Sequence, residues 1–531
     1  MGKVIGIDLG TTFSAVAHVN EYGKPEIIPN ADNHRITSSV ILFKDGFVTI
    51  GNAARQHARS GPEQIVEFVK REMGKSKETF FRTFDGKDYS PEELSSLILT
   101  KLKQDAEAYL DTEITDAVIT VPAYFHDAER QATRNAGKIS GLNVLQVLNE
   151  PTAAALAYGI DQLGAEQTVL VFDLGGGTFD VTIMKVAGSK IEMIATNGDH
   201  RLGGKDWDDK IIIHVAEIFE TEHGENPLQD LRAYQSLQFN AVNAKIRLSH
   251  QERVSIACEY NGKTTLVELT REKFEELTAG LLEKCRALCE IVLSEGNMTW
   301  ADIDTVLLVG GSTRMPMVRE MIANISNKKV NPQEVNPDEV VALGAALHGT
   351  LHQTAESTAS TTDLPDVVID RFFGQDGVPK VTVTDGATHN LGLVVLNSFR
   401  EPIIHVMIPK MTAIPCEKED IFRTVEDNQR SVLVEIVQGL EQDQCKEEID
   451  VFETYKLGEC TLELPQGLPE GSPVRITYSY NRHQLLEVTA TALSSGDAKG
   501  IYDLFSVIKR PTLDAKEVAQ AQANLQSLTV K

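Results

Sequence analysis

The chain has 531 residues, of which 42% are hydrophobic, so it is long enough to bury sizeable cores in about three domains. Its 77 acidic and 51 basic residues give a formal net charge of −26, which argues against non-specific binding to nucleic acid or to an anionic membrane surface. The sequence contains no stretch typical of a signal peptide or a membrane span, and its six cysteines lack metal-type spacing, so a reducing cytoplasm is predicted.

Two segments of the chain repeat one order of features: an apolar strand, an Asp, a glycine turn and a Thr. The first is residues 4–12, with Asp8, and the second is residues 169–178, with Asp173. Glycines let backbone N–H groups approach an anion without interference from a Cβ, and Thr hydroxyls add further donors. Two carboxylates facing a polyphosphate require a hard divalent cation between them. The repetition therefore predicts a site for Mg²⁺ and ATP, although one copy alone is more often an ordinary β-turn.

A third glycine turn follows the apolar strand at residues 307–309 and precedes a helix predicted from Pro316. This turn, residues 310–314, has the sequence Gly-Gly-Ser-Thr-Arg. A glycine turn between a strand and a helix N-terminus is a common cradle for phosphates, so the nucleoside side of the same site is predicted here. The alternative is a plain strand-to-helix connection.

Several segments of the chain resemble the signature stretches of the seventy-kilodalton heat-shock chaperones of the DnaK type. They are residues 6–14, 121–125, 149–155, 172–180 and 309–314. The resemblance is specific over residues 1–349 and looser from about residue 390 to residue 492. The looser part resembles the family's peptide-binding β-domain at residues 408–415, 427–429 and 457–459. The resemblance implies an α/β actin-like (ribonuclease H-like) two-lobed ATPase domain followed by a β-sandwich peptide-binding domain.

The predicted domain order follows from this resemblance and from changes in composition. Residues 1–352 alternate strand-like and helix-like segments and form the nucleotide-binding domain. Residues 353–385 begin with the small polar stretch 353–362, which predicts a disordered insertion, and end in the interdomain linker. Residues 386–508 carry short alternating strands separated by Gly and Pro, which is typical of a β-sandwich. Residues 509–531 predict one short C-terminal helix, and the family's long helical lid is missing.

The resemblance implies which side chains hydrolyse ATP. Lys70 matches a cleft lysine that would supply positive charge to the transition state, although a Lys on a helix is by default solvated. Glu150 matches the carboxylate that orients water and metal, although residues 149–151 are also typical of a helix start. Asp173 and Thr178 complete the implied catalytic set, and Thr178 would also place water near the γ-phosphate.

The resemblance also implies the metal and nucleotide contacts, for each of which a structural role in a turn is the alternative. The implied metal ligands are Asp8, Asp173 and Asp180. The implied nucleotide contacts are Gly10, Thr11, Thr12, Phe13, Gly175, Gly176, Gly177, Gly203, Gly204, Lys245, Ser249, Gly310, Gly311, Ser312, Arg314 and Asp338. The implied cofactors are therefore ATP or ADP together with Mg²⁺.

Some positions depart from the family's pattern. Val242 stands where a Glu usually precedes the residue equivalent to Lys245, which predicts a lost base or ribose contact and weaker nucleotide binding. Lys205 replaces an acidic residue after a glycine turn. Gln146 replaces an Arg used in coupling to J-domain cochaperones, which weighs against this coupling. The family's relay between the cleft and the linker is retained at Pro122, Arg130 and Asp385.

The interdomain linker is predicted at residues 381–385, Val-Thr-Val-Thr-Asp. The family's linker is more apolar, and two of its four aliphatic positions are Thr in this chain. Each lost aliphatic side chain removes burial worth ~1–2 kcal/mol. The sequence therefore predicts weak coupling between nucleotide and peptide.

The resemblance implies an ATP-dependent chaperone, and hence an ATPase, that binds exposed hydrophobic segments of unfolded polypeptides and couples this binding to slow hydrolysis. Main-chain hydrogen bonds and an apolar pocket would hold an extended peptide. Candidate peptide contacts, each at least as typical of a sandwich core, are Met407, Ile408, Met411, Ala413, Val434, Ile436 and Val437. The implied protein partners are a J-domain cochaperone and a nucleotide exchange factor; no nucleic acid or membrane partner is expected.

Two other functions are compatible with parts of the sequence. Val242, Gln146 and the polar linker favour a nucleotide-gated scaffold or cochaperone whose ATPase is nearly idle. A small-molecule kinase on the same actin-like fold is a second alternative, but it leaves the β-sandwich unexplained and no acceptor site is evident in the sequence.

Overall fold

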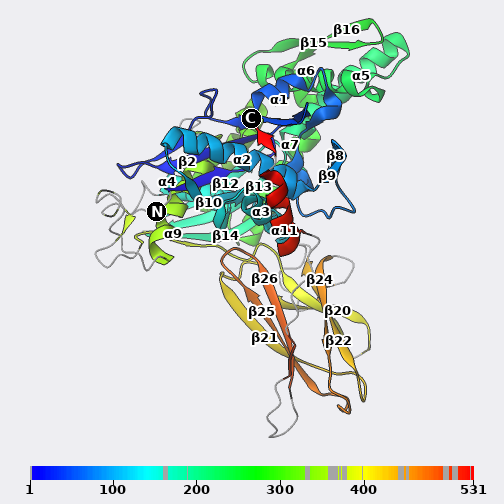
Figure 1. Ribbon diagram of the computed structural model, residues 1–531. Coiled ribbons are helices and arrows are strands. Elements are labelled where there is room, and N and C mark those ends of the chain that lie inside the picture. Colours follow the sequence, from blue (N-terminus) through cyan, green and yellow to red (C-terminus); the bar gives the residue numbers. More distant parts are fainter. Residues whose placement is uncertain are drawn as a thin grey trace. The chain divides into compact units, whose positions relative to one another are not determined.

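The computed structural model of the chain divides into two units (Figure 1). Unit 1 contains residues 1–125, 132–383 and 514–531, and unit 2 contains residues 126–131 and 384–513. The structure describes residues 3–159, 166–187, 189–328, 335–356, 367, 369, 372–373, 379–397, 399–439, 448–449, 454–493, 502–504, 512–526 and 528–531.

The first sheet of unit 1 has the strand order β11-β10-β1-β2-β3, and β4 also pairs with β2. Its strands are β1 (Lys3–Asp8), β2 (Phe13–Val19), β3 (Pro25–Ile28), β4 (Thr37–Ser38), β10 (Ile114–Val121) and β11 (Asn143–Asn149). Strand β1 is parallel to β10 and antiparallel to β2. Residues 4–7 of β1 are all buried, as expected for a strand covered on both faces, and Asp8 follows this run directly.

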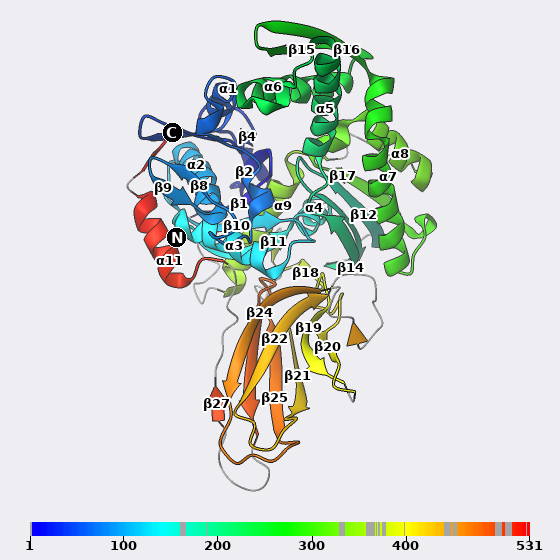
Figure 2. The same cartoon turned by 90° about the vertical axis from the view of Figure 1, so that its right-hand side faces the viewer.

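The second sheet of unit 1 has the order β17-β12-β13-β14-β18 (Figure 2). Its strands are β12 (Glu166–Leu174), β13 (Phe179–Ala187), β14 (Lys190–Asp199), β17 (Thr305–Val309) and β18 (Thr382–Thr384). Strand β12 is parallel to β17 and antiparallel to β13, so it has the same kind of neighbours as β1. The two copies of the sequence repeat therefore occupy equivalent places in two similar sheets.

Helices α4 (Glu150–Gly159) and α9 (Val340–Glu356) pack against each other and against the sheets. A Cβ on Gly344 would lie 1.8 Å from the carbonyl oxygen of Ala153, and a Cβ on Gly6 would lie 2.1 Å from the backbone nitrogen of Ala346. Only glycine permits both close approaches. Because α9 continues to Glu356, the prediction that the insertion begins at residue 353 is wrong for residues 353–356; residues 357–366 lie outside the described residues.

The first half of unit 1 contains two further small sheets. A small sheet of order β28-β6-β5-β7 and a hairpin of β8 and β9 lie beside the first sheet. Their elements and neighbours are β5 (Ile41–Lys44), β6 (Phe47–Ile50), α1 (Asn52–His57), the 3₁₀ turn η1 (Pro62–Gln64), β7 (Ile65–Val66), the 3₁₀ turn η2 (Val69–Glu72), β8 (Arg82–Phe84), β9 (Lys87–Tyr89), α2 (Pro91–Leu110) and β28 (Thr529–Val530). Helix α3 (Asp127–Ile139) connects β10 to β11.

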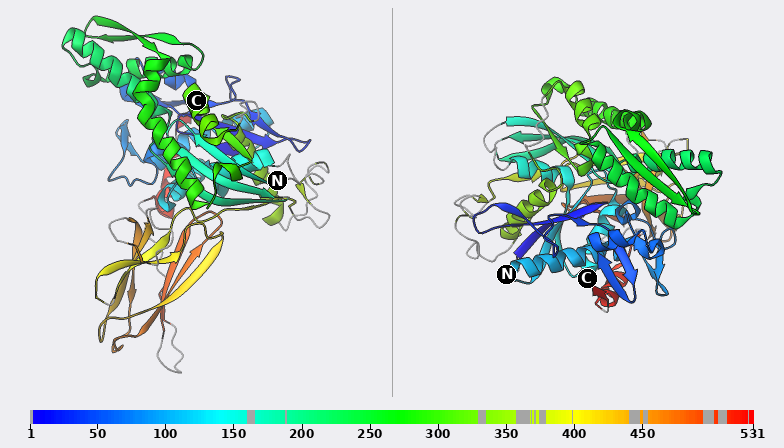
Figure 3. Two further views of the ribbon diagram at one scale, coloured as in Figure 1. Left: turned by 180° about the vertical axis from the view of Figure 1, so that it is seen from behind. Right: turned by 90° about the horizontal axis from the view of Figure 1, so that it is seen from above.

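The remaining helices belong to the second half of unit 1, where α5 and α6 gather with the hairpin of β15 and β16 at one end (Figures 1 and 3). The elements are α5 (Gly204–His223), η3 (Pro227–Gln229), α6 (Leu231–Leu248), β15 (Arg253–Tyr260), β16 (Lys263–Thr270), α7 (Arg271–Glu295), η4 (Trp300–Asp302), η5 (Gly311–Arg314) and α8 (Pro316–Ser326). Local signals set their starts: the side chain of Asp230 caps α6, and that of Thr270 caps α7.

Unit 2 contains two antiparallel sheets, of orders β23-β20-β19-β22-β24 and β21-β25-β26-β27. The strands are β19 (Leu391–Leu396), β20 (Pro402–Ile408), β21 (Cys416–Arg423), β22 (Ser431–Gly439), β23 (Glu448–Ile449), β24 (Thr454–Glu463), β25 (Pro473–Tyr480), β26 (Leu486–Ala492) and β27 (Tyr502–Leu504). One hydrophobic core joins both sheets, and the hydroxyl of the fully buried Tyr478 donates to the carbonyl of Gly392 at 2.7 Å. This packing makes unit 2 a β-sandwich.

The C-terminal segment contains helix α11 (Ala515–Leu525) as well as strand β28. The helix agrees in type with the sequence-based prediction for residues 509–531, whereas the strand was not predicted. Both elements belong to unit 1.

Candidate functional site

A cavity of about 390 Å³ in unit 1 is lined by residues from both of its large sheets. Asp8 follows the buried run of β1, and Asp173 lies at the same end of β12. Most of the nucleotide and catalytic residues predicted from sequence line this cavity. They are Asp8, Gly10, Thr11, Thr12, Phe13, Lys70, Glu150, Asp173, Gly175, Gly176, Thr178, Lys245, Ser249, Gly310, Gly311, Ser312, Arg314 and Asp338.

Four predicted site residues do not line the cavity. Asp180 is almost fully buried on β13, where it pairs in register with Asp173 and accepts a hydrogen bond from the backbone of Tyr124 at 3.1 Å. The others are Gly177, Gly203 and Gly204. A Cβ on Gly203 would lie 2.5 Å from the backbone nitrogen of Gly177, so these glycines allow the start of α5 to pack against the turn that follows β12.

The two repeated glycine turns face each other directly. A Cβ on Gly176 would lie 2.3 Å from the hydroxyl oxygen of Thr12, and a Cβ on Gly177 would lie 2.4 Å from Cγ2 of Thr11. Glycine is therefore required at both positions for the turns to meet. Together the turns bring backbone N–H groups and the Thr hydroxyls to one place, which is the chemistry that binds phosphate oxygens.

A buried ion pair crosses the cavity between Lys70 and Glu150. The Lys70 ammonium donates to Oε1 of Glu150 at 2.6 Å, and the two side chains are 6% and 7% exposed. Burial alone would lower the pKa of Lys70, but the Glu150 and Asp8 carboxylates outweigh it and hold this pKa above its ordinary value. Lys70 is therefore a permanent positive charge inside the cavity.

The carboxylates of the cavity carry more negative charge than Lys70 compensates. Burial and then the nearby Glu150 charge raise the pKa of Asp8 to about 7. Burial, followed by the charges of Glu150 and Asp180, also raises the pKa of Asp173 well above its ordinary value. A bound cation would reverse both shifts, because it favours the ionised carboxylates.

The donor set fits Mg²⁺ better than a metal that needs a complete protein cage. Among the described residues, no group of three or more His, Cys, Asp or Glu side chains is arranged to hold a metal ion. Mg²⁺ usually keeps several waters and is bound through one or two carboxylates and the substrate's phosphates. Asp8 and Asp173 supply such a partial set beside the glycine turns.

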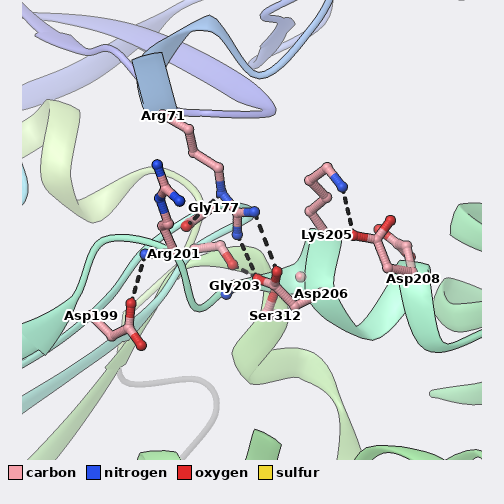
Figure 4. A network of polar contacts seen from close by, with 12 residues as sticks. Arg71, Gly177, Asp199, Arg201, Gly203, Lys205, Asp206, Asp208 and Ser312 are labelled. Atoms are coloured by element: carbon pink, nitrogen blue, oxygen red, sulfur yellow. Dashed lines mark hydrogen bonds and ion pairs between the residues drawn. The ribbon is translucent and has the colours of Figure 1, made fainter. Parts of the chain in front are cut away.

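Arg71 ties the two halves of unit 1 together beside this cavity (Figure 4). Its Nε donates to the carbonyl oxygen of Gly177 at 2.9 Å, and its two terminal nitrogens contact the carboxylate of Asp206. The same carboxylate accepts the backbone N–H of Gly203 at 2.7 Å. One side chain from the turn that carries Lys70 thus holds the glycine turn after β12 and the start of α5.

The wall of the cavity that is predicted to receive the nucleoside is formed by α6 and by the third glycine turn. The Lys245 ammonium is 2.9 Å from the Asp208 carboxylate and 2.8 Å from the carbonyl oxygen of Gly204. Arg314 pairs with Asp338. Val242 and Ile246 give this wall an apolar surface, and Ile246 is 50% exposed.

Sequence reasoning missed several residues that line the cavity. They include Arg55, Glu67, Phe68, Gln235, Gln238, Phe239 and Ile246. Most belong to α6 or to segments near η2, where no short motif marks them. Lys205, which departs from the family pattern, also lines the cavity and its ammonium is 2.6 Å from the carboxylate of Asp209.

The predicted coupling residues belong partly to unit 1 and partly to unit 2. Pro122 belongs to unit 1, whereas Arg130 and Asp385 belong to unit 2, where both are buried. The backbone carbonyl of Asp385 accepts from the N–H of Ile414 at 3.0 Å, and its carboxylate accepts from Gln484 at 3.4 Å. Asp385 is thus fixed to the sandwich by its backbone and its side chain.

Gln146 is buried in unit 1, where its amide oxygen lies 2.9 Å from Nε2 of the buried His348. The side chain that replaces the family's coupling Arg is therefore used inside the protein.

Most of the predicted peptide contacts are buried. Met407, Ile408, Val434 and Ile436 belong to the sandwich core, and Val437 lies with Ile404 in a second small cluster. Met411 is partly exposed and Ala413 is exposed. The strongly exposed apolar side chains of unit 2 are instead Leu396, Phe399, Ile421, Val425, Leu433 and Tyr455. The strand alternation explains the difference, because neighbouring residues of β22 point to opposite faces.

The comparisons of this chain with known proteins agree on one family. The family model described as Hsp70 protein matches residues 4–529. A protein named Chaperone protein DnaK from Thermotoga neapolitana is 41% identical over 502 residues, which cover 93% of this chain and 79% of that protein. Proteins of the same name from Thermotoga petrophila and Thermotoga maritima are 40% identical with the same coverage. None of the helices that the structure describes has the length and apolar character to cross a membrane.

Proposed function

This chain is a member of the Hsp70 family and an ATP-dependent chaperone, and we propose that it binds extended hydrophobic segments of unfolded polypeptides in unit 2 and releases them in step with Mg²⁺–ATP turnover in the cavity of unit 1. We further propose that unit 1 is the two-lobed, actin-like domain of the family and that the protein works in the cytoplasm. The observation that carries the proposal is the meeting of Asp8, Asp173 and the Lys70–Glu150 pair at the paired glycine turns.

Each cavity residue has a chemical task in this proposal. Asp8 and Asp173 would hold Mg²⁺, with Asp180 behind them, and the bound ion would supply positive charge to the phosphates. The glycine turns and Thr11 bind phosphate oxygens. Lys70 stabilises the negative charge of the transition state, while Glu150 and Thr178 orient the attacking water. Arg71 positions the glycine turn after β12 through its contact with Gly177.

The peptide site is proposed at one end of the first sheet of unit 2. The antiparallel register pairs Leu393 with Ile436, which brings the end of β19 toward the start of β22. Leu396 and Leu433 lie at these strand ends, and 49% and 56% of their surfaces are exposed. Phe399 and Val425 lie in the loops that follow β19 and precede β22, so four exposed apolar side chains come from neighbouring segments. The buried Val434 and Ile436 support this site from the core.

The alternatives from the sequence are weaker explanations. A scaffold with a nearly idle ATPase is not favoured, because the matched relatives are named chaperones and the Lys70–Glu150 pair is present. A small-molecule kinase leaves the sandwich of unit 2 without a task. We propose a J-domain cochaperone and an exchange factor as partners, with weaker J-domain coupling because Gln146 is buried against His348.

The proposed peptide site leads to two expectations: peptide is released fast, and a substitution within the site weakens peptide binding. The described part of residues 384–513 contains strands and no helix that could cover a bound peptide, so stopped-flow release of a fluorescent hydrophobic peptide should be complete within seconds even with ADP. Leu433→Asp should weaken peptide binding about tenfold or more, because a charge in an apolar contact must be desolvated. Leu266→Asp places the same charge at an exposed position of β16 in unit 1 and should have no effect. Equal losses in both variants, or release lasting many minutes, would exclude this site.

The pairing of the linker strand β18 indicates how the coupling between peptide binding and ATP hydrolysis can be strengthened. Strand β18 joins the edge of β14, and the N–H of Thr382 donates to the carbonyl of Ser189 at 2.8 Å, so its pairing depends on the backbone. The double variant Thr382→Leu, Thr384→Leu keeps these hydrogen bonds and adds apolar area, so the paired state should be more populated. Peptide should then stimulate ATP hydrolysis more than in the parent, whereas Asp385→Ala should reduce the stimulation. A double variant that couples no better than the parent would make this segment a passive tether.

A further inference from the structure

The C-terminal segment, residues 514–531, is built into unit 1. Asp514 and Glu517 form reciprocal side-chain to backbone hydrogen bonds that cap the start of α11. Val518 and Ala521 on this helix are buried. Further along, the side chains of Leu525, Leu528 and Val530 pack against the hydrophobic core that surrounds the first sheet. Figures 1 and 2 show α11, in red, alongside α2 and α3.

The last residues of this segment extend a sheet of unit 1. Strand β28 pairs in parallel with β6, with Thr529 opposite Phe47 and Val530 opposite Val48. The N–H of Lys531 donates to the carbonyl of Val48 at 2.8 Å, and the N–H of Ile50 donates to the carbonyl of Lys531 at 2.9 Å. The Lys531 ammonium lies 3.9 Å from the centre of the Phe47 ring. β28 therefore covers an edge of the sheet that β6 would otherwise leave unpaired.

This pairing changes the topology of the molecule. The chain leaves unit 1 between Val383 and Thr384 and returns to it between Leu513 and Asp514. The main part of unit 2 is thus an insertion whose two ends continue directly into strands or helices of unit 1. At the first end, β18 joins the sheet of β14, and at the second end, α11 leads to β28 on the sheet of β6.

Residues on or next to both anchoring sheets line the nucleotide cavity. The sheet that receives β18 also carries Asp173, at the end of β12. The sheet that receives β28 includes β7, which is followed within a few residues by Lys70. A ligand that contacts both sides favours one spacing between these sheets over others. An insertion anchored to both sheets responds to that spacing, whereas an insertion anchored to one does not.

We propose that the C-terminal segment is a second anchor that transmits the nucleotide state to the peptide-binding unit. The inference rests on the proposed function, since it concerns the regulation of the same peptide site. It gives the proposed coupling a second route beside the polar linker. In this proposal β28 stays paired with β6 in every nucleotide state, and the signal passes through the covalent connection to this anchor rather than through release of the strand.

The most direct test lengthens the connection to the second anchor without removing the anchor. The resulting protein is called the slack variant. Twelve Gly and Ser residues are inserted between Leu513 and Asp514, and the matched control carries the same insert after Gly262, in the turn between β15 and β16, where an added Cβ would meet no atom within 4 Å. A flexible linker of this length relaxes the connection while α11 and β28 remain docked. The insert at residue 513 should bring the ratio of peptide release rates with ATP and ADP to within about twofold of one, and the control should keep the parental ratio. A parental ratio in the first variant overturns the proposal.

A second pair of variants tests the strand itself. Val530→Asp places a charge against the core and should detach β28, whereas Thr529→Asp changes an exposed position of the same strand. Hydrogen exchange of the Ile50 amide reports the pairing directly: it should be protected equally with ATP and ADP in the parent and become fast in Val530→Asp. Fast exchange with an unchanged nucleotide response would overturn the proposal, as would loss of protection in one nucleotide state of the parent.

The parent protein separates failure of this inference from failure of the proposed function. If peptide release from the parent does not depend on the nucleotide, the proposed function itself fails and the second anchor has no signal to carry. If the parent responds and the slack variant responds equally, only the second anchor is excluded. Single-turnover ATP hydrolysis without peptide should be within about twofold of the parent in the slack variant, because the insert leaves the cavity residues in place.

Discussion

Lys70→Ala is expected to slow single-turnover ATP hydrolysis by about 10²-fold or more while changing the affinity for Mg²⁺–ATP much less. The Lys70 ammonium is buried beside Glu150 and is held in its charged form by that carboxylate and by Asp8. Such a charge favours the transition state most, because negative charge spreads over the transferred phosphoryl group there. Rapid mixing of enzyme with a small amount of radiolabelled ATP measures the step directly.

The control for this variant is Lys75→Ala. Lys75 lies just beyond η2 and pairs with Glu72 in a more exposed position, so its removal should leave the rate unchanged. Because Lys70→Ala leaves Glu150 buried without its partner, thermal unfolding of both variants must be recorded with bound nucleotide. Hydrolysis at the parental rate in a folded Lys70→Ala protein would exclude the assigned role.

Asp173→Asn is expected to remove most of the Mg²⁺ dependence of ATP binding, with a loss of about tenfold or more in affinity measured with Mg²⁺. The nucleotide-free protein, by contrast, should become more stable against thermal unfolding. The pKa of Asp173 is raised in the folded state, so at neutral pH its ionised form costs stability that the neutral Asn does not. Calorimetric titration with and without Mg²⁺, together with thermal unfolding of the nucleotide-free protein, tests both effects.

Asp304→Asn is the matched control, since Asp304 is exposed beside the other end of β12 and its carboxylate accepts from the N–H of Thr168 at 2.7 Å. An Asn can still accept this bond, so neither Mg²⁺ dependence nor stability should change appreciably. If Asp173→Asn binds ATP equally well with and without Mg²⁺, and as tightly as the parent binds Mg²⁺–ATP, the bridging cation is contradicted.

The cavity could be predicted from sequence wherever a strand ends in a short motif. Asp8 and Asp173 belong to two similar sheets, and a repeat of apolar strand, Asp and glycine turn is visible without a structure. Arg71 and Gln238 could not be found in this way. Their contacts depend on how a 3₁₀ turn and a helix lie across the cavity, and no local pattern records this.

Other differences between sequence and structure also have physical causes. The apolar residues of β22 were expected to contact peptide, but strand alternation directs Val434 and Ile436 into the core and Leu433 outward. Residues 353–356 have a polar composition but continue α9. Strand β28 is too short to show a period, and its partner β6 lies at the other end of the sequence, so only the folded chain reveals the pairing.

Peptide affinity measured with Mg²⁺–ATP and with Mg²⁺–ADP tests the central claim most directly. Using the Lys70→Ala variant keeps the bound ATP intact during the measurement, and a fluorescent hydrophobic peptide reports the affinity by anisotropy. A nucleotide can change peptide binding only through its different affinities for the coupled states of the protein. We expect dissociation constants that differ by about fivefold or more between the two nucleotides. Equal dissociation constants would contradict it.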